Sequence, residues 1–172
     1  MKKIYLLIII LIPIISNNLK AEVPYIVDFK YILNESEAGK KAQNFLKTKL
    51  KKGLDNLKSK EKKIQDEEKK LIEQKKLITP EEYKKKVTEL RQKVSSLQKE
   101  RNVLLESVAK SRSKARAELL KNLNPILKDY MKEKNIRLVL DKKDLILADE
   151  NLDITKDIMD LLNKRLKTIK LN

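Results

Sequence analysis

The sequence predicts an α+β fold, mostly α, in which a small β-body carries one long antiparallel coiled-coil hairpin arm. Of 172 residues, 38% are charged and only two are glycine, a composition typical of long solvated helices. Apolar residues recur every seven positions within 35–134. Short runs rich in β-branched and aromatic residues flank that region, at 22–34 and 135–172. We therefore expect the arm at 35–134 and the β-body in the two flanking pieces.

Residues 1–21 read as a signal peptide. Lys2 and Lys3 precede the apolar run 4–15, and a polar stretch follows as far as Ala21. The run of about 12 residues is short of the roughly 20 that span a bilayer. We predict cleavage after Ala21 and export of the remaining chain; an uncleaved N-terminal anchor is the alternative.

The β-body is expected to contain three short strands and a closing helix. Val23 to Leu33 reads as a strand running into a turn, and 136–140 as a second strand. A tight turn at 141–144 would return the chain into a third strand at 145–148. Asp153 should cap the last helix, whose apolar face would be Ile154, Ile158, Leu161, Leu162 and Ile169. Three short strands and one helix bury too little apolar surface to be stable alone. We therefore expect the strands to meet across the hairpin and several subunits to share them in one β-body.

A coiled-coil seam two residues wide per heptad is predicted along both helices of the arm. Antiparallel packing would set Leu71 near Val87 or Leu90, and Leu57 near Leu97 to Leu104. Pro125 is expected to kink or break the second helix where the arm meets the β-body. The predicted seam residues are Leu50, Leu54, Leu57, Ile64, Leu71, Val87, Leu90, Val94, Leu97, Leu104 and Val108.

The tip of the arm is predicted near 78–83, where one helix stops and the next begins at once. Thr79 and Glu82 have the spacing of a capping box, and Pro80 fits the first helical position. Ile78 and Tyr83 would form the accompanying hydrophobic staple. The chain must therefore double back here.

Positive charge is concentrated on the arm. The whole chain carries a formal +16, and residues 35–134 hold 29 Lys and Arg against 16 Asp and Glu, a net +13. Such charged runs usually form a solvated helix surface with ion pairs between neighbouring turns. Ion pairing alone, however, would leave the positive and negative charges nearly equal in number. The excess predicts attraction for anions such as acidic polypeptides, acidic lipid headgroups or nucleic acid. Export argues against nucleic acid as a physiological partner.

An enzyme is not expected. The chain has no His and no Cys, which excludes His-dependent Ser and Cys nucleophile systems and N/S-ligated zinc sites. Two glycines cannot furnish a phosphate-binding loop. The acidic stretch 149–153 lacks the central Gly and closing Glu of a calcium loop. We predict no catalytic, cofactor-binding or metal-binding residue.

The order of these elements and the sequence of the tail resemble the Skp/OmpH family of periplasmic chaperones. The first strand and turn read YIVDFKYILNES. The tail, Ile136-Arg137-Leu138-Val139-Leu140-Asp141 followed by Leu152-Asp153-Ile154-Thr155-Lys156-Asp157-Ile158, is similar to the family's I-D-L-V-V-D … D-I-T ending. The arms match the family only in their general character, and many Lys-rich coiled coils would match equally well. The tail and the order of the elements therefore carry the resemblance.

The resemblance implies a periplasmic homotrimer whose shared β-body projects three arms around a cavity. Unfolded outer-membrane proteins would be held there without ATP, and anionic lipid or lipopolysaccharide is a further candidate partner. The candidate client contacts are the off-seam residues Phe45, Ile72, Leu77, Val103 and Leu105 together with Lys62, Lys69, Lys76, Lys84 and Arg91. Two alternatives remain open: a membrane-tethered structural coiled-coil spacer, and a polyanion-binding envelope protein.

Overall fold

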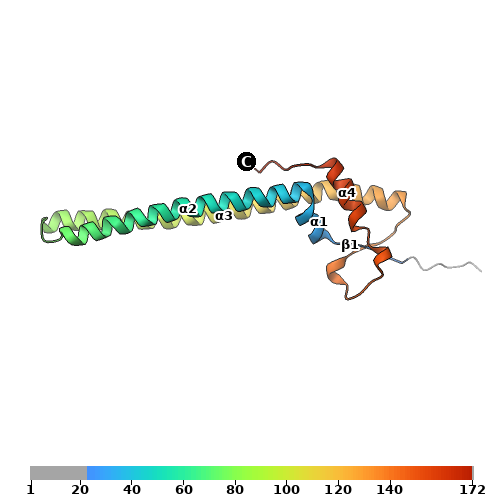
Figure 1. The fold of residues 1–172 in the computed structure, drawn as a ribbon, viewed down its shortest axis with the longest axis horizontal. Helices are drawn as coiled ribbons and strands as arrows, with labels where there is room; N and C mark the ends of the chain where they lie inside the picture. Colours follow the sequence, from blue (N-terminus) through green and yellow to red (C-terminus); the bar gives the residue numbers. More distant parts are fainter. Residues whose placement is uncertain (1–22, 172) are drawn as a thin grey trace, which may run out of the picture.

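A computed structural model describes residues 23–171, so the predicted signal peptide lies outside the described residues. Two long helices form a hairpin arm, and the remaining elements gather in a head at its open end (Figure 1). The predicted class is confirmed: residues 23–171 are mostly helical and contain one small sheet. In chain order the elements are β1 (Tyr25–Val27), α1 (Phe29–Glu35), α2 (Glu37–Gln74), α3 (Pro80–Glu133), β2 (Val139–Asp141), the 3₁₀ helices η1 (Lys142–Asp144) and η2 (Glu150–Leu152), and α4 (Thr155–Arg165).

The strands β1 and β2 meet across the hairpin, as the sequence predicts. They pair in parallel, with Ile26 opposite Leu140 at the centre of the register. The whole arm forms the connection between them, and its length permits the crossover that parallel strands require. The backbone N–H of Ile154 also donates to the Ile26 carbonyl, at 2.9 Å, so the start of α4 is tied to the same strand.

Both strands are shorter than predicted because helix caps take over their ends. Asp28 ends β1 and starts α1, since its Oδ1 accepts a hydrogen bond of 2.7 Å from the Tyr31 N–H. Before β2, Asn135 adopts a positive φ of 55°, a conformation common where helices end. The Ile136 N–H then donates to the Met131 carbonyl at 2.8 Å. Ile136 therefore belongs to the helix ending and not to a strand.

The predicted third strand at 145–148 is wrong. The segment that should turn the chain back is the 3₁₀ helix η1, in which the Leu145 N–H donates to the Lys142 carbonyl. After this turn, residues 145–148 pair with neither strand. Ile146 and Leu147 are instead 105% and 91% exposed.

Of the two outcomes expected at Pro125, a kink or a break, the break is wrong, because α3 continues through this residue to Glu133. Proline has no N–H to donate to the carbonyl of Lys121, four residues back, and this loss disfavours a helix interior. Its neighbours offset that cost through burial, since Leu123 is completely buried and Ile126 is 6% exposed. Packing in the head thus overrides the local preference of the proline.

The core of the head draws on both arm helices as well as on the flanking pieces. Ala38 from α2 and Leu119, Leu123 and Ile126 from α3 belong to its main cluster. The head therefore extends into the region 35–134 that we assigned to the arm. The other buried members are Val27, Ile32, Ile154, Ile158, Met159 and Leu162.

The last helix, α4, begins one residue later than predicted. Its N-cap is Ile154, and Asp153 contributes by accepting a 2.9 Å hydrogen bond from the Thr155 N–H. Leu161, predicted on the buried face, is 37% exposed, and Met159 is buried in its place. Ile169 lies beyond the end of the helix. Within residues 23–171, none of the helices has the length and apolarity needed to cross a membrane.

Candidate functional site

The tip of the arm is built as the sequence predicts. Thr79 Oγ1 accepts from the Glu82 N–H at 3.3 Å, and Glu82 Oε2 accepts from the Thr79 N–H at 3.2 Å. Pro80 is the first residue of α3, so the capping box and the proline start the helix together. Ile78 and Tyr83 are half-buried, and Lys75 Nζ lies 5.6 Å from the centre of the Tyr83 ring, a cation–π distance.

Polar contacts between α2 and α3 fix the register that the sequence left open by half a heptad. They join Lys86 to Gln74, Lys93 to Glu67, and Lys60 to Glu100. In each contact the two residues lie equally far from Pro80, and successive contacts are one heptad apart. The register is therefore uniform from the tip to the middle of the arm.

Most predicted seam residues lie between the helices. Leu57, Leu71 and Val108 are buried, while Leu54 and Val94 differ from the prediction at 41% and 54% exposed. In a pair of helices only the central line is enclosed, so flanking positions of a heptad stay open to solvent. The remaining six are half-buried: Leu50, Ile64, Val87, Leu90, Leu97 and Leu104.

The seam continues next to the head, beyond the last predicted seam residues. There the buried residues include Ala42, Leu46, Ser111 and Ala115, several of them too small to stand out as heptad markers. The heptad line from Val108 to Ala115 was the available signal. Alanine is helix-favouring on any face, and its presence therefore indicates little about burial.

All ten candidate client contacts are exposed and lie along α2, α3 or the tip turn. Leu77 at the tip is 82% exposed and Val103 in the middle of α3 is 64% exposed, whereas Phe45 near the head is 40% exposed. They do not converge on one pocket; they are distributed over the length of the arm. The other seven are Ile72, Leu105, Lys62, Lys69, Lys76, Lys84 and Arg91.

One hollow near the tip brings two of these candidates together. It encloses about 460 Å³, and Ile72 and Arg91 both line it. Val94 forms part of its wall, which accounts for the exposure of this seam residue. The remaining apolar lining comes from Ile64, Leu71, Tyr83, Val87 and Leu90.

A second hollow lies where the arm joins the head, and we call the surrounding part of α2 and α3 the arm root (residues 38–50 and 104–119). The hollow encloses about 620 Å³ over the apolar residues Leu33, Leu46 and Leu119. Lys47, Arg112 and Arg116 line it, and no carboxylate does. Such a combination suits segments that carry apolar side chains and negative charge.

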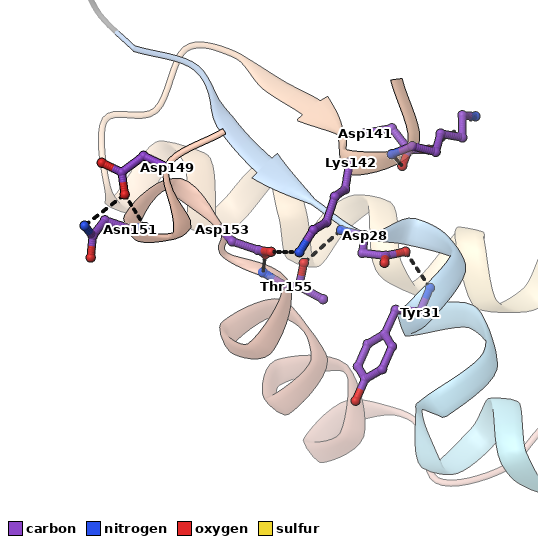
Figure 2. Close-up of polar contacts among 9 residues, drawn as sticks. Asp28, Tyr31, Asp141, Lys142, Asp149, Asn151, Asp153 and Thr155 are labelled. Carbon is purple, nitrogen blue, oxygen red and sulfur yellow. Dashed lines mark hydrogen bonds and ion pairs between the residues drawn. The ribbon is translucent and has the colours of Figure 1, made fainter. Parts of the chain in front are cut away.

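A hydrogen-bond network holds the head in place (Figure 2). Thr155 Oγ1 accepts from the Asp28 N–H at 2.8 Å, while the Thr155 N–H donates to Asp153 Oδ1. Lys142 Nζ donates to Asp153 Oδ2 at 2.7 Å. Burial raises the pKa of Asp153, but the hydrogen bonds from Lys142 and Thr155 outweigh burial and hold this pKa below its ordinary value. The network links the junction of β1 and α1 to η1 and α4.

Three further acidic side chains of the head have structural contacts, two of them as caps. Asp141 and Asp149 each accept from the N–H two residues on, Lys143 and Asn151 respectively. Tyr130 donates to Asp157 at 2.6 Å, and burial together with this hydrogen bond raises the pKa of Tyr130 to about 12. In the part of the chain that the structure describes, no three acidic side chains converge as a metal site would need. Structural roles therefore account for these carboxylates.

Comparison with known proteins points to one family. The model of the family described as outer membrane protein (OmpH-like) matches residues 25–162. A crystal structure of a candidate outer membrane chaperone (OmpH-like) from Caulobacter crescentus is similar, with a TM-score of 0.79 and 21% identity over 86% of this chain and 89% of that one. No curated protein matches. The family match spans both strands, the whole arm and most of α4, and the chain therefore belongs to the OmpH-like family.

Proposed function

We propose that this protein is a periplasmic chaperone that holds unfolded outer-membrane proteins along its arms and prevents their aggregation. It would act without ATP and without catalysis. Membership of the OmpH-like family supports the association with outer-membrane proteins, and the name of the similar Caulobacter structure supports the chaperone role. The N-terminal sequence supports export.

The observation that carries the proposal is the surface of the arm. It exposes single apolar side chains, among them Leu77, Val103 and Ile72, at separated points on a strongly basic helical pair. A large continuous apolar patch would make the arm itself prone to aggregate, but single apolar residues at separated points do not form such a patch. They suit a surface that contacts an extended chain at many places.

Many weak contacts would give both retention and release. Each exposed apolar residue buries little area on its own, so each contact breaks quickly, while several contacts on one chain act together. The positive charge of the arm adds a long-range attraction for acidic clients that needs no fixed pairing. The same charge makes anionic lipid or lipopolysaccharide a further candidate partner. Physiological binding to nucleic acid is not part of the proposal.

Exposed residues in the head support assembly as a homotrimer. Ile146 and Leu147 lie adjacent in the segment after η1 and are almost fully exposed, beside a sheet of only two strands. In the described part of the chain Asp153 and Ile154 contact the outer edge of β1 at Ile26, whereas no further strand pairs with β2, and a two-stranded sheet is marginal alone. Strands or apolar segments from neighbouring subunits would cover both features.

The proposal is tested by diluting a urea-unfolded outer-membrane β-barrel protein into buffer with and without the full mature chain. We expect turbidity to be suppressed near one trimer per client, in the absence of any nucleotide. Light scattering should give the mass of three chains, and Ile146→Asp/Leu147→Asp should lower it. A monomer that leaves the turbidity unchanged would overturn the proposal.

A charge test separates the chaperone from a polyanion-binding protein, which the net +13 of the arm also favours. At about 0.5 M salt, where the screening length is only a few ångströms, a pure polyanion binder would lose its ligand. We expect the chaperone to retain part of its suppression, because the apolar contacts persist. Complete loss at this salt concentration would favour the polyanion binder.

A further inference from the structure

The chain after α4 turns back and runs along the arm root (Figure 1). We call residues 166–171 the strap. Leu171, at its end, is 6% exposed and belongs to one buried cluster with Ala42, Leu46, Val108 and Ala115 of the arm root. Ile169 packs against this cluster and also against the core of the head.

The strap is a non-helical segment with side chains that alternate in burial. Thr168 and Lys170 are exposed, Ile169 is half-buried and Leu171 is buried. A period of two is the pattern of an extended chain that lies with one side on a surface. Two branched aliphatic side chains, Ile169 and Leu171, therefore make the apolar contact of the strap with the arm root, while Leu166 packs against the head.

The arm root can accept these side chains because its own are small. Ala42 and Ala115 stand where the rest of the seam carries Leu, Ile or Val, and Ser111 is buried beside them. Two facing small residues leave a seam underfilled, and contacts are lost unless another side chain enters. The 620 Å³ hollow is lined by Ala42 and Ala115 as well. The strap thus supplies only part of the side chains that this region lacks.

Polar contacts hold the strap weakly. Lys167 Nζ lies 2.9 Å from Glu37 Oε1, but the two side chains are 58% and 46% exposed, and ion pairs in such positions contribute little. The hydrogen bond from the Glu37 N–H to Asn163 Oδ1 involves α4 and would survive if the strap moved. Release of the strap would therefore cost mainly apolar contacts, those of Leu171 and Ile169 with the arm root and those of Leu166 and Ile169 with the core of the head.

We propose that the arm root is a binding site for an extended polypeptide segment with branched aliphatic side chains at alternate positions, and that the strap occupies this site until such a segment displaces it. The inference rests on the proposed function in one respect: it takes the segment from a client. Strands of outer-membrane barrels alternate apolar and polar residues with a period of two, so their unfolded chains contain such segments. While the strap occupies the site, the apparent affinity for these segments equals the intrinsic affinity multiplied by the fraction of molecules whose site is open.

The test uses the full mature chain and labelled peptides. One peptide repeats residues 164–172 with a photoreactive group in place of the Leu171 side chain; another is a barrel strand of the same length and alternation. The strap-release variant is Ile169→Ser/Leu171→Ser, and Lys170→Ser is the matched control at the exposed position between them. We expect both peptides to label 42–46 and 108–115 at least about tenfold more in the release variant than in the control.

Three outcomes would overturn the inference: no labelling of the arm root in the release variant, equal labelling in variant and control, or labelling by the repeat of the strap alone. The last would restrict the site to the chain's own tail or to that of a second copy. Preferential labelling by anionic lipid probes would also count against a polypeptide site. Because the peptides are read out directly, failure to suppress client aggregation would defeat the proposed function and leave this result standing.

Discussion

In the head, Ile32, Leu123 and Leu162 are completely buried, whereas beyond the arm root only two of the eight predicted seam residues, Leu57 and Leu71, are buried. The head gathers residues from β1, α1, α4 and both arm helices around one core. The arm has a single line of contact between two helices. Stability in the head therefore depends on residues more than a hundred positions apart, while stability in the arm is local and repeated. The arm can expose side chains to ligands because it uses so few of them for packing.

A cavity in the head should have the largest effect. Leu162→Ala removes a fully buried side chain, so we expect a loss of about 2–5 kcal/mol in the free energy of unfolding. Leu97→Ala, at a half-buried position of the arm, should cost about 1 kcal/mol. Urea denaturation followed by circular dichroism, at one fixed protein concentration, measures both. Equal losses would mean that the two regions are packed alike.

The network at Asp153 should make the stability of the head depend on pH. Its pKa is lower in the folded chain than in the unfolded one, so this contribution is fully present above the unfolded pKa. It should be lost as the pH falls from about 5 through the lowered folded value. Asp153→Asn should flatten this part of the profile of unfolding free energy against pH, and the capping aspartate variant Asp149→Asn serves as control. An unchanged profile in Asp153→Asn would contradict the assignment.

The capping box should affect the tip alone. Thr79→Ala removes the acceptor for the Glu82 N–H, and N-cap replacements of this kind cost about 1 kcal/mol. We expect faster amide hydrogen exchange in the first turns of α3 and no change in the head. Thr88→Ala, farther along the same helix, is the control. Faster exchange spread over the whole arm would show that the tip sets the register of the entire hairpin.

The smallest effect is expected from a surface ion pair. Lys93 and Glu67 pair across the arm with side chains 51% and 46% exposed, so Lys93→Met should change the free energy of unfolding by no more than about 0.5 kcal/mol. The double variant with Glu67→Gln completes a mutant cycle in the same urea assay. A coupling above about 1 kcal/mol would mean that such pairs, and not the seam alone, hold the helices together.

The sequence was informative about the arm and much less so about the head. Heptads and the capping box at Thr79 are local signals, and the structure has the hairpin and its tip where they predict. The apolar run 145–148 gave no comparable information, because short apolar runs fit a strand or an exposed segment equally well. At Pro125 the local signal is clear, since proline disfavours a helix interior. The helix nevertheless continues, because burial of Leu123 and Ile126 outweighs this preference.

The distribution of the candidate contacts could be predicted, and the two hollows could not. Exposure of Leu77 or Val103 follows from their position off the heptad lines. The tip hollow depends on how the side chains of α2 and α3 fit against each other, and the arm root depends on Leu171 reaching Ala42 and Ala115 from a distant part of the chain. Such contacts leave no periodic trace in a single sequence.

The contacts that lie symmetrically about Pro80 make the arm a structure of adjustable length. Each heptad of α2 faces one heptad of α3, so a paired deletion of seven residues from each helix would keep every remaining partner opposite its own. Such a deletion shortens the arm by about 10 Å and leaves the tip and the head unchanged. Removing seven residues from one helix alone would shift all contacts between the deletion and the tip. The length of the arm can therefore change in steps of one heptad per helix, and such a change does not affect how the head assembles.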